Sequence, residues 1–94
     1  MRKLSEIPAE EGMVVIGKAI PAITEMVKKA GKKDGLSNAE YFGKMLENAP
    51  KEAVKLCSAI SGEDYSSKGI ITVMQDLADM VNDDNLMELF SSQM

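Results

Sequence analysis

The chain has 94 residues, enough for one domain with one core. Its content of 45% hydrophobic and 28% charged residues is typical of a globular rather than a disordered protein. It contains no His, no Trp and a single Cys, so the usual partners of a catalytic nucleophile and the usual zinc ligands are missing from the sequence. This composition favours a protein that binds over one that catalyses.

The net charge of −4 is distributed unevenly along the chain. Residues 1–62 contain ten Lys and Arg against eight Asp and Glu, a net +2, whereas residues 63–94 contain one Lys against seven acids, a net −6. Because the acidic third would repel phosphates, the sequence argues against binding of nucleic acid. It permits head-to-tail self-association or binding of a basic partner, although acids that merely solvate the last helices would give the same pattern.

The sequence predicts a soluble cytoplasmic protein, organised as a single helical domain over residues 1–94. Cys57 has no second Cys with which to form a disulfide within the chain, which favours a reducing compartment. No apolar run approaches the roughly 20 residues that a membrane span requires. Acids interrupt the segment that follows Arg2 and Lys3, so we expect no targeting segment and no membrane contact.

The first helix is expected to begin at Ser5 or at the Ile7-Pro8 step and to end near Gly31, a residue suited to a helix C-cap. Pro21 lies within it and removes a backbone donor, which predicts either a kink or two helices that meet there. The apolar residues recur at steps of three and four and predict one buried stripe: Met13, Ile16, Ile20, Ile23 and Val27.

Two further helices follow from capping signals. Ser37 and Glu40 have the spacing of a capping box, so a second helix should start there and end near Asn48, because Pro50 disfavours helical geometry in the residue before it. Pro50 then suits the first turn of a third helix, which Gly62 closes. The apolar stripes of these helices are Ala39, Phe42, Met45 and Leu46, and Ala53, Leu56, Cys57 and Ile60.

A polar stretch, Glu63 to Gly69, precedes a fourth helix with the strongest stripe in the chain: Ile70, Val73, Met74, Leu77 and Val81. Asp83, Asp84 or Asn85 should end this helix and cap a short fifth one, Leu86 to about Ser91. The predicted fold is all-α, a compact orthogonal bundle of four to six short helices. Its predicted core contains Ile16, Ile20, Ile23, Phe42, Leu46, Leu56, Ile60, Val73, Leu77 and Val81.

The sequence contains few residues suited to catalysis, metal binding or phosphate binding. Cys57 lies within an apolar stripe and, without a His to activate it, is expected to be a core residue. The acids Asp76, Asp79 and Asp83 lack the spacing and the central Gly of a calcium loop, so a solvated helix face is expected. No Gly-rich phosphate cradle is found. We therefore expect no enzyme activity and no metal, nucleotide or prosthetic group.

Eight Met residues suit an aromatic-poor core and also an adaptable contact surface. Met13, Met45 and Met74 lie on stripes and are expected in the core. Partner contacts are expected from side chains beside the stripes of the last two helices or near the exposed end of the fifth: Met80, Met87, Leu89 and Phe90. The alternative is that the fifth helix merely docks on its own domain.

Four segments carry a resemblance that extends over nearly the full length: the opening Lys3–Glu6, Ile20–Ile23, the mid-chain helix Val54–Gly62 and the close Asp84–Gln93. In these segments the chain resembles the small tail assembly chaperones of long-tailed bacteriophages that infect Gram-positive bacteria. The most distinctive part is the Leu89-Phe90 pair before a short polar tail.

The resemblance implies a chaperone that coats the tape measure protein until tail tube subunits replace it, made in a short form and a longer frameshifted form. It implies the tape measure protein as a partner, with the tail tube protein as a further candidate. It also implies a place in the cytoplasm of the bacterial host, absence from the mature virion, and no catalytic residue. The alternative function is a small helical regulatory adaptor or inhibitor that binds one protein partner. A neighbouring gene for a very long coiled-coil protein would favour the chaperone.

Overall fold

The computed structural model describes residues 2–93, and within them it contains helices and no strand. A short 3-10 helix, η1, covers Leu4–Glu6. The α-helices are α1 (Ala9–Ala30), α2 (Asn38–Asn48), α3 (Pro50–Ser61), α4 (Ile70–Val81) and α5 (Asp84–Gln93). The predicted all-α class is confirmed, and five α-helices lie within the expected four to six. Between residues 2 and 93, no helix has both the length and the apolar character needed to cross a bilayer.

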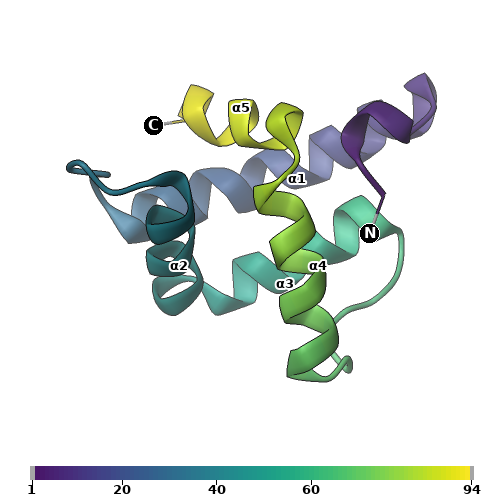
Figure 1. Ribbon diagram of the computed structural model, residues 1–94. Helices are drawn as coiled ribbons and strands as arrows, with labels where there is room; N and C mark the ends of the chain where they lie inside the picture. The colour runs from purple at the N-terminus through teal and green to yellow at the C-terminus, as the bar shows by residue number, and fades with distance from the viewer. Residues whose placement is uncertain (1, 94) are drawn as a thin grey trace.

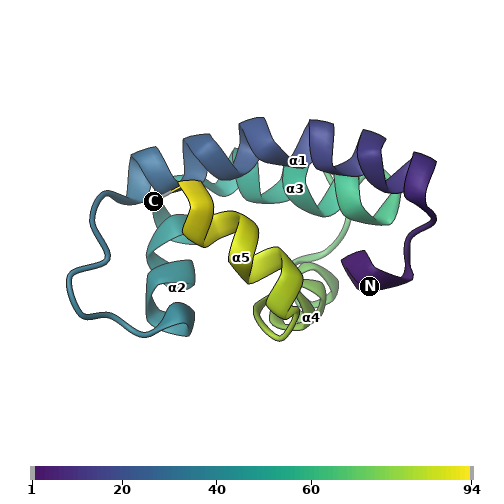
Figure 2. The same cartoon turned by 90° about the horizontal axis from the view of Figure 1, so that it is seen from above.

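The helices pack in two directions. α1 and α3 lie side by side and run in opposite directions, while α2 and α4 run across them (Figure 1, Figure 2). α5 leaves the end of α4 and crosses toward the C-terminal half of α1, where the Thr24 hydroxyl donates to Gln93 Oε1 over 3.1 Å. All five α-helices contribute buried side chains to one core.

α1 continues as one helix through Pro21, whose ring is exposed. Its buried face differs from the predicted stripe, because it consists largely of small side chains that let α3 approach closely. Ile20, predicted to lie in the core, is 37% exposed, and Met13 is also exposed. The side chains that α1 does bury are Val15, Ala19, Ala22, Ile23, Met26 and Ala30.

The local capping signals are found where the sequence places them. The Ser37 hydroxyl accepts from the Glu40 backbone N–H over 3.1 Å, and Glu40 Oε1 accepts from the Ser37 N–H over 3.0 Å. Pro50 occupies the first turn of α3, and Gly62 ends that helix with φ +79°, a conformation that favours glycine. α1 begins at Ala9 with Pro8 as its N-cap, which agrees with the expected start at the Ile7-Pro8 step; the alternative start at Ser5 lies in η1 instead.

Most of the predicted core is buried. Six of the predicted residues are buried: Ile23, Phe42, Leu56, Ile60, Val73 and Leu77. Leu46 and Val81 are half-buried against this core, and Ile16 is half-buried as well. Met13, Ile20 and Met74 are exposed, so their assignment to the core was wrong. Met45 and Cys57 are buried as expected.

Ile60→Ala should lower the free energy of unfolding by about 2–5 kcal/mol, because Ile60 is 1% exposed and its truncation leaves a cavity. Ile20→Ala removes the same atoms from an exposed position and should cost less than about 1 kcal/mol. Denaturant unfolding followed by circular dichroism measures both values. Equal losses for the two variants would contradict the burial of α1 described above.

Candidate protein-binding surface

Chemical groups suited to catalysis are sparse in the structure. Residues 2–93 contain no group of three or more His, Cys, Asp or Glu side chains placed to hold a metal ion. Cys57 is buried, and burial, together with the negative charge of Asp76, raises the pKa of its thiol to about 11. At neutral pH the thiol is therefore protonated and shielded, as a core cysteine should be.

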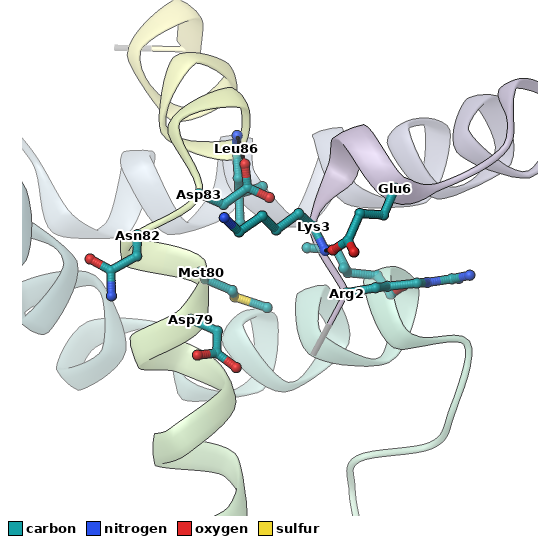
Figure 3. Close-up of a pocket in the computed structure, with 9 residues that line it drawn as sticks. Arg2, Lys3, Glu6, Asp79, Met80, Asn82, Asp83 and Leu86 are labelled. Atoms are coloured by element: carbon teal, nitrogen blue, oxygen red, sulfur yellow. Dashed lines mark hydrogen bonds between the residues drawn. The ribbon is translucent and has the colours of Figure 1, made fainter.

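A polar hollow of about 180 Å³ lies between the N-terminal segment and the junction of α4 and α5 (Figure 3). Asp83 lies at this junction, with one carboxylate oxygen accepting from the backbone N–H groups of Asn85 and Leu86 over 3.1 and 3.3 Å. Its other oxygen accepts from the Leu4 N–H over 2.9 Å. Asp83 was expected both as a candidate cap of the fifth helix and on a solvated face. It does cap α5, but it is buried because it also holds the N-terminal segment.

The basic side of the same hollow is also engaged. The Arg2 guanidinium donates to the Ile60 carbonyl over 2.9 Å and forms an ion pair with Glu11. Glu6 accepts from the Lys3 backbone N–H over 2.8 Å. These contacts hold the N-terminal segment against α3 and the α4–α5 junction. The polar side chains of this hollow therefore stabilise the fold, and we assign the hollow no ligand.

Two of the four residues predicted to contact a partner are buried. Met80 is 2% exposed and Phe90 is 3% exposed. The Phe90 ring packs against Phe42 of α2, with 5.5 Å between ring centroids and 43° between planes. The prediction that Phe90 lies near an exposed end was wrong, because α5 is longer than expected and packs Leu86 and Phe90 on the core. Met80, which the sequence allowed either in the core or on a contact surface, lies on the buried face of α4 with Val73 and Leu77. Neither Met80 nor Phe90 is accessible to a partner in this structure.

Met87 and Leu89 are half-buried and pack against the core from the two sides of α5. They leave part of their surface exposed, whereas Met80 and Phe90 are buried. The structure therefore does not join the four predicted residues into one contact surface. It favours the alternative in which α5 docks on its own domain.

The apolar surface that the structure does form lies between α2 and α4. It is a hollow of about 210 Å³ lined entirely by uncharged, non-hydrogen-bonding side chains and by glycine. Four lining residues come from each helix: Ala39, Phe42, Gly43 and Leu46, and Met74, Leu77, Ala78 and Val81. We call this the α2–α4 groove. Phe42 and Leu77 are buried beneath it.

The groove continues onto an exposed apolar edge at the start of α4. Ile71 is 70% exposed, and its neighbour Ile70 is exposed to the same degree. Met74, one turn further along, is exposed and also lines the groove. Isolated exposed apolar residues are ordinary, but a contiguous row beside a groove indicates a contact surface.

Gly43 is unusual among the groove residues. It lies in the middle of α2, where glycine costs about 1 kcal/mol of stability relative to alanine. A Cβ atom built at Gly43 would meet no atom within 4 Å, so nothing within the described part of the chain requires glycine there. The missing side chain deepens the groove and would let another backbone approach α2 closely.

A second exposed apolar area lies on α1, at Met13, Val14 and Ile20. It surrounds Gly17, where an added Cβ would also meet no atom within 4 Å. These side chains line neither of the two hollows described above. The α2–α4 groove is therefore the better candidate for binding.

α4 is positioned by Tyr65, which lies in the loop between α3 and α4. The Tyr65 hydroxyl donates to Asp76 of α4 over 2.5 Å, and the Tyr65 backbone N–H donates to Ser58 of α3 over 3.0 Å. Lys68 lies over the same ring, 4.7 Å from its centroid. Burial, and next the hydrogen bond to Asp76, raise the pKa of Tyr65 to about 12.

Sequence reasoning missed the groove residues because it assigned Met74 and the stripe of α4 wholly to the core. One feature of the sequence could have indicated a contact surface on α4. The apolar residues of α4 include Ile71 and Ala78 as well as the predicted stripe, and they cover about half of the helix circumference. A sector wider than the roughly 100° that a small domain buries predicts a second contact surface.

Comparison of the chain with protein-family models, with curated proteins and with solved structures gave no match.

Raising the pH should destabilise the protein through Tyr65. Its pKa is near 10 in the unfolded chain and about 12 in the folded one, so the stabilisation is complete below pH 10 and is lost as pH rises through 12. Tyr65→Phe should show a smaller loss of stability between about pH 10 and pH 12, because one raised pKa is absent. Thermal unfolding across this range measures the difference. Identical pH profiles would contradict the Tyr65–Asp76 contact.

Proposed function

We propose that the protein is a phage tail assembly chaperone that binds the tape measure protein transiently during tail morphogenesis. The observation that carries this proposal is the α2–α4 groove with its exposed edge, an apolar surface offered to another chain. Its shape suits a helix, and helix-in-groove binding is a common way to hold a helical partner. The resemblance of the sequence to such chaperones names the partner.

The surface has the properties that transient binding requires. Most of the core lies elsewhere, so release of a partner from the groove leaves the helices packed on one another. Met74 brings a flexible side chain that can adapt to several successive segments of a long partner. In this proposal tail tube subunits displace the chaperone in the host cytoplasm, and the finished virion lacks it.

Co-expression with the candidate tape measure protein tests the proposal. The intact chain should be recovered in a complex with that protein, and Ile71→Gln should reduce the recovery several-fold by making the exposed edge polar. Val14→Gln makes the same kind of change on the exposed face of α1 and should leave recovery unchanged. Both variants should fold, because both side chains are already exposed.

If the intact chain recovers no tape measure protein at any salt concentration, the chaperone proposal fails. The remaining candidate is then a small helical regulatory adaptor or inhibitor that uses the same groove on one protein partner. Phe90→Ser is unsuitable for this test, because Phe90 is part of the core and its truncation would destabilise the fold by about 3–5 kcal/mol.

A further inference from the structure

We propose that the outer face of α1 pairs with the same face of a second copy of this chain, with the two helices antiparallel. The inference goes beyond the proposed function, since it uses a helix that does not line the α2–α4 groove. It is carried by three properties of α1: the spacing of its exposed apolar residues, the order of the charges along them and the position of the helix at the edge of the molecule.

α1 carries a second stripe on the side opposite its buried one. Buried residues of α1 recur at alternating steps of four and three: Val15, Ala19, Ala22 and Met26. A row of exposed residues on the other side has the same steps: Glu10, Val14, Gly17, Pro21, Thr24 and Lys28. Two long helices that pack along each other have this spacing. We call this row the outer stripe of α1.

The middle of the outer stripe is apolar. Met13 and Val14 are 75% and 56% exposed, and the exposed Ile20 precedes Pro21. A Cβ atom added at Gly17 would meet no atom within 4 Å, so the described part of the chain leaves open space there and a second helix can approach closely. These side chains form one exposed apolar area on a single helix, which indicates a contact surface.

Opposite charges lie at the two ends of the outer stripe, Glu10 at one end and Lys28 at the other. Within residues 2–93 neither of them forms an ion pair, whereas the adjacent Glu11 and Lys29 each pair with a residue elsewhere in the chain. Glu10 and Lys28 are 18 residues apart, about 27 Å along the helix, so they cannot meet within one chain.

An antiparallel pair of α1 helices about a twofold axis brings these charges together. Glu10 of each copy then lies opposite Lys28 of the other, and Gly17 lies opposite Pro21, because both pairs of positions are centred on Ala19. The proline ring of each copy therefore meets the open space at the glycine of the other. A parallel pair would place Glu10 beside Glu10 and Lys28 beside Lys28, so the charges select the antiparallel arrangement.

The order of the charges also favours a second copy as the occupant. An acid, an apolar stretch and a base in this order are complemented by the same stripe running in the opposite direction. Lys18 and Glu25 lie at the side of the stripe rather than on it, and both are exposed. Two copies bring two of each to that side, so these charges cancel in sum.

The fold leaves this side of α1 uncovered. Figure 2 shows α1 along one long edge of the molecule, with α2 and α4 toward the opposite edge. The 22 residues of α1 extend over about 33 Å, close to the longest dimension of the molecule, 35 Å. Two copies can therefore lie along each other over most of this helix while each keeps its α2–α4 groove exposed.

One pair of helices forms a small interface, so we expect a dissociation constant of about 1–100 µM. At lower concentrations the chain is a monomer with Met13 exposed. Sedimentation equilibrium of the full chain from about 2 to about 500 µM tests this range. The mean mass should rise from that of the 10.2 kDa monomer toward twice that value and no further, because a twofold contact closes on itself.

Charge reversal tests the pairs between Glu10 and Lys28. Glu10→Lys and Lys28→Glu should each weaken self-association about tenfold, because each turns two attractive pairs into repulsive ones. The variant with both changes, and an equimolar mixture of the two single variants, should associate within about threefold of the intact chain. The dipole of α1 also favours an acid at its start and a base at its end, but it acts within one chain and mixing cannot restore it.

Two uncharged variants separate this contact from the groove. Val14→Gln makes the middle of the outer stripe polar and should weaken self-association several-fold, whereas Ile71→Gln on α4 should change it less than about twofold. In recovery of the tape measure protein the two variants have the opposite effects, so the failure of one proposal is distinguishable from that of the other. Circular dichroism verifies that each variant is folded, as expected for changes at exposed side chains.

A chain that remains monomeric up to about 500 µM would overturn the inference. So would single charge reversals that leave self-association unchanged, or a mixture of the two single variants that associates as weakly as either alone. Weakening by Ile71→Gln and not by Val14→Gln would assign the contact between copies to the groove. A mass that rises beyond twice that of the monomer would contradict a closed pair.

Discussion

The packing of α1 against α3 is the contact on which the other helices depend. It is the most extensive contact between any two helices of the described chain, and α1 makes it through a face rich in alanine. Ala19 and Ala22 let α3 approach closely, so Ile23 and Leu56 are fully buried. This pair forms the base across which α2 and α4 lie.

The use of small side chains in this contact has a consequence for the surface. α1 turns its alanines inward, so larger apolar residues such as Met13 and Ile20 remain outside. α4 also carries a wider apolar sector than the core can cover, and Ile71 and Met74 are left exposed. The exposed apolar area is therefore concentrated on two helices, and on α4 it adjoins a groove. The proposed function rests on this exposed apolar area.

Features set by neighbouring residues could be predicted from the sequence. The Ser37–Glu40 capping box, the Pro50 helix start and the Gly62 helix end all depend on contacts within a few residues. The choice of buried face on α1 could not be predicted, because its apolar residues cover both the alanine face and the face of Ile20. The partner across the core decides between them, and helix periodicity alone does not identify that partner.

The same limit explains the errors at the candidate site. Phe90 was placed outside because α5 was expected to be too short to bury its apolar residues, and Met80 was a contact candidate because it lies beside the stripe predicted for α4. Asp83 caps the N-terminus of α5, so the helix begins at Asp84. The other carboxylate oxygen of Asp83 accepts from the Leu4 N–H, and these two residues are 79 positions apart in the chain. A contact of that sequence separation leaves no local pattern. The groove likewise depends on how α2 and α4 pack, so only the structure shows that Gly43 lines it and faces open space.

The central claim is that the faces of α1 and α4 turned to solvent are apolar, and methionine methyl groups report on it directly. In an NMR spectrum of the isolated protein with labelled methionine methyls, a soluble paramagnetic agent broadens signals from exposed groups. The account predicts strong broadening for Met13 and Met74, and protection of Met26, Met45 and Met80 in the core. Protection of Met74 together with broadening of Met80 would place the opposite face of α4 outward and contradict the groove.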